Sequence, residues 1–347
     1  ALLLTVGPVP RASAADCVDY SKYLHLAASI PASEMYPRAT AAGGFAYVID
    51  GSVLKVMDVS DPALPEQVGN LPLGGSPMQA AMQGTYLYIA AGGLRVVDVS
   101  DPAHPSLVGQ VATPSGYANS VAVAGSYAYL SAHWGGVYVI DISIPASPHI
   151  VAHLYTAGYP ADVEVAGDLA YLAAAEYGLL VLDVSSPVQA HVVGSIETPG
   201  DALNVALAGP VAFVADGYGG LAVVDISDPA APELVTQLPA VLSVEDVAAV
   251  GSTVYYTDSP EGMIVLDASD PAQPRRVGGL AVWEASRWLS VHDGIAYLGA
   301  SPGRLILADE PNPASAPLAG LVDTPGDAYD VAVQGDRAYV ADALTGL

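Results

Sequence analysis

Short stretches of alternating apolar and polar residues recur along nearly the whole chain. Residues 120–125 (SVAVAG), 127–132 (YAYLSA) and 137–143 (VYVIDIS) are typical, and each is followed by a turn signal such as Gly or Pro. This alternation predicts short β-strands. A fourth type of strand, as in residues 106–112 (SLVGQVA), follows a Pro-bounded turn. Each unit is therefore predicted to contain four antiparallel strands.

The four-strand units repeat at a fixed interval. One aromatic residue in the second strand marks each unit, and successive markers are 41 or 42 residues apart: Tyr47, Tyr88, Tyr129, Tyr171, Phe213, Tyr255, Tyr297 and Tyr339. An Asp at the end of the third strand keeps the same interval: Asp58, Asp98, Asp141, Asp183, Asp225, Asp267 and Asp309. A four-stranded unit of about 42 residues has the size of a propeller blade.

The repeat predicts an all-β fold, a β-propeller of four-stranded blades. Small residues such as Ala122 and Ala206 sit between bulky apolar neighbours in each first strand, which suits an innermost strand close to the next sheet. Residues 23–33 read as a lone fourth strand that could close the ring. We therefore predict eight blades with the last one truncated, and seven blades as the alternative.

The N-terminus differs in composition from the repeats. An apolar run ending in Ala12-Ser13-Ala14 has the small-x-small form of a signal-peptidase site. We predict three parts: a signal-peptide remnant at 1–14, an N-terminal segment with the ring-closing strand at 15–42, and repeats at 43–347, comprising seven full units and a partial eighth. Cys17 is the single cysteine, so no internal disulfide can form.

The end of the third strand carries a recurring phrase. It reads LRVVDVSDP at 94–102, LLVLDVSSP at 179–187, LAVVDISDP at 221–229 and MIVLDASDP at 263–271. These phrases resemble the LVIVD repeat, a propeller-type repeat of bacterial and archaeal exported or cell-surface proteins. The resemblance covers residues 43–347 and weakens at LILADEPNP (305–313). It implies architecture and an exported location, and no catalytic function.

The recurring Asp is better explained by structure than by catalysis. Asp and Ser at a strand end accept hydrogen bonds from backbone N–H groups of the following turn, and Pro fixes that turn. A catalytic residue has no reason to recur in every unit. We therefore look for function where the units differ.

Composition and charge exclude some classes of binding partner. Apolar residues make up 52% of the chain, and 35 Gly, 28 Pro and 20 Tyr suit many short strands joined by tight turns. The net charge is -26. Such a surface repels phosphate backbones and anionic lipid heads, so we expect no nucleic-acid partner. No later stretch is apolar for the ~18 residues of a membrane span, so we expect no membrane insertion.

The variable loops provide the candidate ligand-binding residues. In a propeller, the loops from second to third strand and from fourth strand to the next unit share one face around the channel mouth. These loops carry aromatic and charged side chains that could stack on a sugar or anchor a peptide. The candidates are His133, Trp134, Tyr159, Glu176, Tyr177, Asp216, Tyr218, Arg287 and Trp288.

Carboxylates near the channel mouth provide the candidate catalytic residues. Polar residues start most of the first strands, including Asp162 and Asp246. Glu164 occupies a position that is Ala in most other units, and burial there would raise its pKa. Strand-end capping for the Asp residues, and a water-facing position for Glu164, are the structural alternatives.

Other chemistry lacks support in the sequence. There is no HExxH, GxSxG or P-loop motif, so we expect no cofactor. His149 and His153 are spaced to share one face of an outer strand, yet no third ligand follows, and we predict no metal site.

These observations favour an exported binding or adhesion protein, secreted or on the cell surface, that holds a glycan or protein ligand on one loop face. One alternative is a polysaccharide lyase or hydrolase that uses Glu164 with Asp162 or Asp246. The other is a purely structural surface protein.

Overall fold

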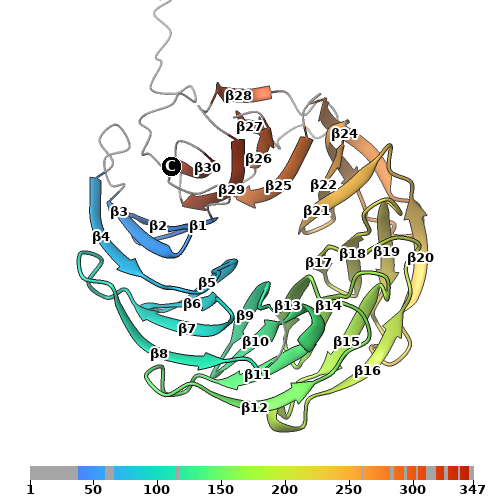
Figure 1. Cartoon of the computed structure of the whole chain (residues 1–347). Coiled ribbons are helices and arrows are strands. Elements are labelled where there is room, and N and C mark those ends of the chain that lie inside the picture. The colour runs from blue at the N-terminus through green and yellow to red at the C-terminus, as the bar shows by residue number, and fades with distance from the viewer. Residues whose placement is uncertain are drawn as a thin grey trace, which may run out of the picture.

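The computed structural model describes residues 38–58, 66–114, 117–259 and 261–281, followed by strands within 285–343. The fold is a ring of antiparallel sheets, as Figure 1 shows. The signal remnant predicted at 1–14 and the ring-closing strand predicted at 23–33 lie outside the described residues. The first sheet begins at Arg38, so the repeats extend five residues before position 43.

The described strands form seven four-stranded sheets and one two-stranded sheet, each with its strands in chain order. The first three sheets comprise β1 Arg38–Ala42, β2 Phe45–Asp50, β3 Val53–Asp58 and β4 Glu66–Pro72; β5 Gln79–Gln83, β6 Tyr86–Ala90, β7 Gly93–Asp98 and β8 Ser106–Ala112; β9 Ser120–Ala124, β10 Tyr127–Ser131, β11 Val137–Asp141 and β12 His149–Leu154. The fourth and fifth comprise β13 Asp162–Ala166, β14 Leu169–Ala173, β15 Leu179–Asp183 and β16 His191–Ile196; β17 Asn204–Ala208, β18 Val211–Ala215, β19 Leu221–Asp225 and β20 Glu233–Leu238. The sixth to eighth comprise β21 Ser243–Val250, β22 Thr253–Ser259, β23 Gly262–Asp267 and β24 Arg275–Ala281; β25 Ala285–His292, β26 Ile295–Ser301, β27 Arg304–Asp309 and β28 Leu318–Asp323; β29 Asp327–Gln334 and β30 Arg337–Ala343. Two short 3₁₀ turns interrupt the loops, η3 His133–Gly135 and η4 Pro187–Gln189.

The first strands of the sheets form the inner wall of the ring. Each contacts the first strand of the next sheet, and β29 contacts both β25 and β1, so the eighth sheet lies beside the first (Figure 1). Only β29 and β30 are described for the eighth unit, and the number of complete blades stays a prediction.

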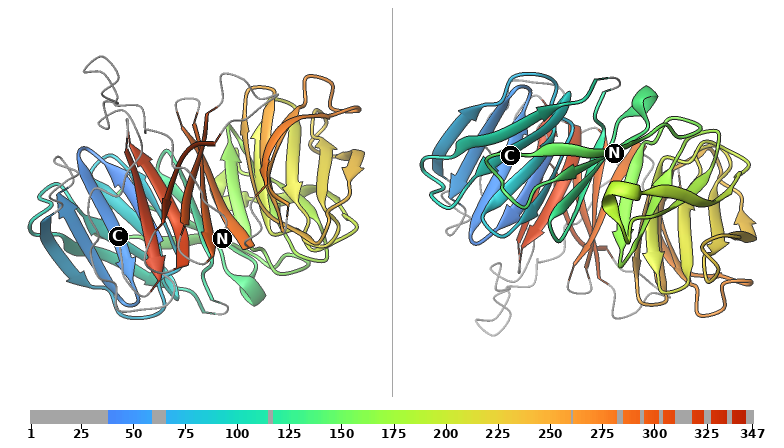
Figure 2. Two further views of the ribbon diagram at one scale, coloured as in Figure 1. Left: turned by 90° about the horizontal axis from the view of Figure 1, so that it is seen from above. Right: turned by 90° about the horizontal axis from the view of Figure 1, so that it is seen from below.

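The antiparallel order gives the ring two faces, seen edge-on in Figure 2. Loops from second to third strand, and from fourth strand to the next sheet, lie on one face, which we call the loop face. Turns from first to second and from third to fourth strand lie on the other, which we call the opposite face.

The hydrophobic core lies between the sheets. Each of five apolar clusters joins residues of two neighbouring sheets, from the first to the sixth. The six markers from Tyr47 to Tyr255 are buried in this core, and most pair across strands with a small residue of the first strand, as Tyr129 does with Ala122 and Phe213 with Ala206. A small residue at this position leaves room for the buried ring.

The recurring phrase has a structural role on the opposite face. In the third sheet, Asp141 Oδ1 accepts hydrogen bonds from the N–H (2.8 Å) and hydroxyl (2.6 Å) of Ser143. The matching Asp residues in the second, fourth, fifth and sixth sheets accept the backbone N–H of the Ser two positions later. In the third sheet, the Ser143 hydrogen bonds lower the pKa of Asp141. The predicted capping role of this Asp is confirmed.

The same phrase also locks neighbouring sheets together. A Cβ on Gly109 of β8 would overlap the carbonyl O of Pro145 and lie 2.6 Å from Cδ of Pro148, both in the next sheet's third-to-fourth-strand turn. Gly69 and Gly194 have matching contacts with the turns that follow them. The Gly is replaced by Ala152 between the third and fourth sheets, where the next turn has Ala190 in place of its second Pro. It is replaced by Thr236 between the fifth and sixth sheets, where the next turn keeps Pro271 and Pro274. At the junctions of Gly69, Gly109 and Gly194, the glycine therefore allows close contact with the prolines of the next turn.

Candidate functional site

Exposed aromatic side chains gather on the loop face. They are Tyr117 (70% exposed), Trp134 (64%), Tyr155 (76%), Tyr177 (41%) and Tyr218 (79%). Every exposed Trp and Tyr side chain in the described part of the chain lies on this face, whereas the large apolar side chains exposed on the opposite face are aliphatic, such as Ile144 and Val188. The two faces of the ring therefore differ in what they can bind.

A shared backbone turn presents three of the predicted residues. The second-to-third-strand loops of the third, fourth and fifth sheets each place one residue at positive φ: His133 (36°), Ala175 (47°) and Gly217 (55°). Gly tolerates this conformation, whereas His and Ala are strained in it. The next residue in each loop points outward and is exposed: Trp134, Glu176 and Tyr218.

The loop that carries Trp134 differs from its two neighbours in how it joins the next sheet. Ala175 forms a backbone bridge to Ala202, and Gly217 forms one to Val244. The corresponding partner of His133 is Pro160, which has no N–H and cannot form such a bridge. Aromatic contacts replace the bridge at this junction.

Three rings form those contacts. His133 stacks on Tyr159 with ring centroids 4.7 Å apart and an interplanar angle of 13°. Trp134 packs edge-on against the same Tyr159 at 4.7 Å. The predicted residues His133, Trp134 and Tyr159 therefore form one cluster that holds the exposed indole in place.

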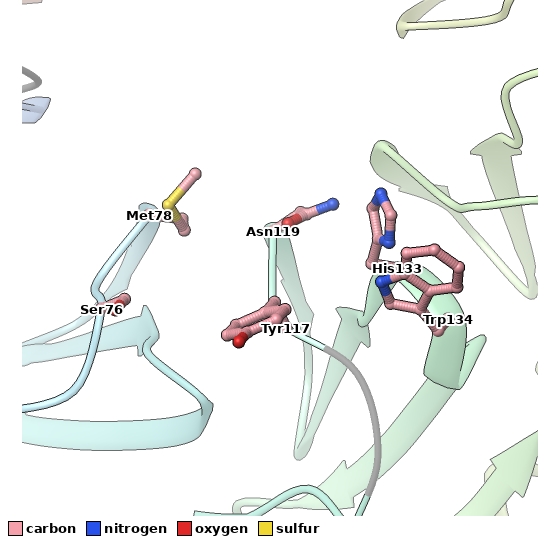
Figure 3. Close-up of a pocket in the computed structure, with 6 residues that line it drawn as sticks. All are labelled: Ser76, Met78, Tyr117, Asn119, His133 and Trp134. Atoms are coloured by element: carbon pink, nitrogen blue, oxygen red, sulfur yellow. The ribbon is translucent and has the colours of Figure 1, made fainter.

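A hollow of about 270 Å³ opens beside this cluster. Its lining comes from two fourth-to-first-strand loops and one second-to-third-strand loop: Ser76, Met78, Tyr117, Asn119, His133 and Trp134. Figure 3 shows Ser76 and Met78 on one side, His133 and Trp134 on the other, and Tyr117 and Asn119 between them. None of the six lining residues is charged, although the chain has a net charge of -26.

Asp216 is placed differently from the exposed candidates. It is fully buried, and its carboxylate accepts hydrogen bonds from Thr198 Oγ1, from Gly200 N–H (2.8 Å) and from Gln237 Nε2 (3.2 Å). Burial raises the pKa of Asp216, and these hydrogen bonds oppose the rise. Asp216 therefore has a structural role: it connects the loops around the fifth sheet and supports the turn that presents Tyr218.

Two predicted residues lie in the seventh sheet. Arg287 and Trp288 belong to β25, where the backbone pairs Trp288 with Gly299. Their side chains lie outside what the structure describes, so their role in ligand binding stays a prediction.

Polar residues at the start of the inner strands connect neighbouring sheets. Gln79 Oε1 accepts the N–H of Val121 (2.8 Å), and Asp246 Oδ2 accepts the N–H of Leu289 (2.7 Å). Asp162 accepts hydrogen bonds from Ser120 Oγ (2.9 Å), Asn204 Nδ2 (3.3 Å) and Val205 N–H (3.4 Å). Each bond spans 42 or 43 residues, from one unit to the next. These bonds favour a structural role for Asp162 and Asp246.

Glu164 is a carboxylate of the inner wall whose pKa is raised. It replaces the usual small residue opposite the marker Tyr171 and accepts a hydrogen bond from the backbone N–H of Leu207 in the next sheet. Burial, and secondly the charge of Asp162, raise the pKa of Glu164 to about 7, while the Leu207 hydrogen bond opposes the rise. A half-buried acid with this pKa exchanges its proton near neutral pH.

This pKa predicts a pH-dependent stability that Glu164→Gln removes. Between pH 4.5 and about 7 the folded state holds a proton that the unfolded state releases, so rising pH destabilises the fold. After discounting for partial exposure, we expect Glu164→Gln to be more stable than wild type by about 1–2 kcal/mol above pH 7, and to match it near pH 4.5. Denaturant unfolding across this range measures the difference.

The exposed Glu176→Gln serves as the control, because its neutralisation should leave the pH profile of wild type unchanged. A Glu164→Gln difference that stays constant from pH 4.5 to 8 would contradict the assignment.

The prediction that His149 and His153 share one face of the outer strand is wrong. A β-bulge between β11 and β12 shifts the register, so His149 pairs with Asp141 and His153 with Tyr138, and the two rings face opposite sides of the sheet. His153 stacks on Tyr138 at 4.0 Å, and its Nε2 lies 2.6 Å from the Gly135 carbonyl O. In the described part of the chain, no three His, Cys, Asp or Glu side chains cluster to hold a metal.

None of the described helices is long and apolar enough to cross a membrane. The described helices are the two short 3₁₀ turns.

An all-β ring of four-stranded antiparallel sheets with an inner wall of first strands is a β-propeller. The LVIVD repeat model matches residues 40–71, 74–113, 115–156, 157–198, 199–238, 243–280 and 325–347. The chain therefore belongs to the LVIVD repeat family, as its recurring phrase indicated. The matched stretches leave out 281–324, which contain β25 to β28 and the weakened phrase.

Solved structures support the fold. The computationally designed Ika8 protein matches with a TM-score of 0.77 at 12% identity, covering 93% of this chain and 97% of its own. Sqt1 of Saccharomyces cerevisiae matches at 0.73 and 12%, covering 93% and 96%. The beta-propeller domain of Cps50 (Swd1) of Myceliophteria thermophila matches at 0.61 and 12%, covering 78% and 93%. None of the curated proteins matches the sequence.

The sequence reading did not include Tyr117 and Tyr155 among the candidates. Both follow a fourth strand, in loops where turn residues dominate the pattern. Their position in the loop between an outer strand and the next first strand could have placed them on the loop face, because the equivalent loop of each unit lies there.

Proposed function

We propose that this LVIVD-repeat propeller is a binding protein that holds a glycan or a protein segment on its loop face. The observation that carries the proposal is the concentration of five exposed aromatic side chains on that face. Rigid aromatic rings provide large contact area at small entropic cost and anchor ligands. The signal-like N-terminus at 1–14 supports a ligand met outside the cell.

The aromatic rings are held by the fold rather than by flexible tails. Tyr159 supports Trp134 through an edge-on contact. Gly158 packs so closely on the next loop that an added Cβ would lie 2.9 Å from the Tyr177 ring. Such preorganisation lowers the entropy lost when a ligand binds. A regular scaffold with fixed aromatic side chains in its variable loops is suited to recognition.

A combined loop-face variant tests this function. We expect wild type to bind members of a glycan array or a random-peptide library, and the variant Tyr117→Ser, Trp134→Ala, Tyr177→Ser and Tyr218→Ser to lose at least tenfold in affinity, because the anchoring rings are removed. Binding is measured on immobilised full-length protein.

The matched control changes the opposite face. Ile144→Ser, Val188→Ser and Val250→Thr remove exposed apolar groups there and should leave binding as in wild type. The proposal fails if the loop-face variant binds as wild type does, or if only the opposite-face variant loses binding.

A further inference from the structure

We propose that the hollow beside Trp134 binds a neutral pyranose ring of a polysaccharide, an inference that rests on the proposed function and commits it to one class of ligand. The hollow is defined by Ser76, Met78, Tyr117, Asn119, His133 and Trp134.

The first argument is charge. The protein has 46 charged side chains, 36 acidic and 10 basic, yet none lines the hollow. A site for a phosphorylated or carboxylated ligand needs Arg or Lys, and a site for a cationic peptide needs carboxylates. A lining free of both matches an uncharged ligand.

The second argument is the mixture of aromatic and polar groups. Trp134 and Tyr117 are each more than 60% exposed and both line the hollow. The C–H groups on one side of a pyranose pack well on such rings. Asn119 and Ser76 place an amide and a hydroxyl at the same hollow, and these groups can exchange hydrogen bonds with sugar hydroxyls.

The third argument is an unused polar atom in a strained residue. Nδ1 of His133 is buried and has no hydrogen-bond partner among the described residues. His133 also holds a positive φ of 36°. Strained backbone and unpaired buried polar atoms concentrate at functional sites. Because His133 also lines the hollow, this strained turn lies at the proposed site.

Size points to one ring of a longer chain. A volume of about 270 Å³ lies just below the ~300–1,000 Å³ of pockets that enclose drug-sized ligands. The other exposed aromatics, Tyr155, Tyr177 and Tyr218, continue along the loop face on the third, fourth and fifth sheets. The hollow therefore suits one residue of a polysaccharide whose neighbours lie across the same face.

Affinity electrophoresis of the full chain in gels containing dissolved neutral glucans, galactans and mannans tests the inference. We expect at least one neutral polysaccharide to retard wild type, and Trp134→Ala to weaken this binding at least tenfold, because the stacking surface is lost. Trp134→Phe should retain most of the binding, and Asn119→Ala should weaken it.

The control is Ile144→Ser, which changes an exposed apolar residue of the same sheet on the opposite face and should be retarded as wild type is. Gels containing polygalacturonate, an anionic polysaccharide, should retard no variant. Circular dichroism of Trp134→Ala, expected to match wild type, separates loss of binding from loss of fold.

Two results would overturn the inference: no neutral polysaccharide retards wild type, or Trp134→Ala is retarded as strongly as wild type. If wild type instead binds peptides in the library through its loop face, this inference fails and the proposed function stands. If nothing binds through the loop face, both fail.

Discussion

We expect Gly109→Val to lower the free energy of unfolding by about 2–3 kcal/mol. Gly109 lies where β8 meets the next sheet, and any Cβ there would overlap the Pro145 carbonyl O. Two well-packed sheets would have to separate to make room, which costs packing along the whole junction. Urea or guanidinium denaturation measures the loss.

The matched control is Gln110→Val, one residue further along the same strand. Gln110 is exposed, so the same β-branched side chain should change stability by no more than about 0.5 kcal/mol. Equal effects of the two substitutions would contradict the proposed interlock between glycine and proline.

The junction between the third and fourth sheets has a different pair of residues at these two positions. There Ala152 stands in the place of the glycine, and Ala190 stands in the place of the second proline. Gly109→Ala combined with Pro148→Ala should therefore lose less stability than the two single variants predict together. A fully additive double variant would show that the two positions do not couple.

The second large effect is expected at Asp216. Asp216→Ala should lower the free energy of unfolding by about 2–4 kcal/mol, because it leaves Thr198 Oγ1, the Gly200 N–H and Gln237 Nε2 without their shared acceptor in a buried site. Gln237 also donates to the Gly219 carbonyl O (2.7 Å), so the whole loop around Tyr218 should loosen. Denaturant unfolding and limited proteolysis of this loop measure the two effects.

Asp201→Ala provides the control, because Asp201 is an exposed carboxylate beside the same loops. Its removal should change stability by no more than about 0.5 kcal/mol and leave the proteolysis pattern unchanged. If Asp216→Ala is as mild as Asp201→Ala, the carboxylate does not hold the loops.

Most of the fold could be predicted from the sequence, and part of the candidate site. Alternation with period two and a 42-residue repeat require only local pattern, so strands such as β9 to β11 were predicted to within a few residues. The aromatic cluster of His133, Trp134 and Tyr159 was also within reach, because variation between units points to loops. The burial of Asp216 could not be predicted, because its three hydrogen-bond partners are 16 to 21 residues away in sequence.

The sequence by itself determined the sheets, the turns at the recurring Asp–Ser pairs and the identity of the loops that vary. The tertiary structure decided how the units meet. Gly109 packs closely against the next sheet's prolines, Asp162 and Asp246 bond to strands about 42 residues away, and a bulge separates His149 from His153. The physical reason is that strand patterning is local, whereas contacts between sheets depend on the ring that brings each unit against the next.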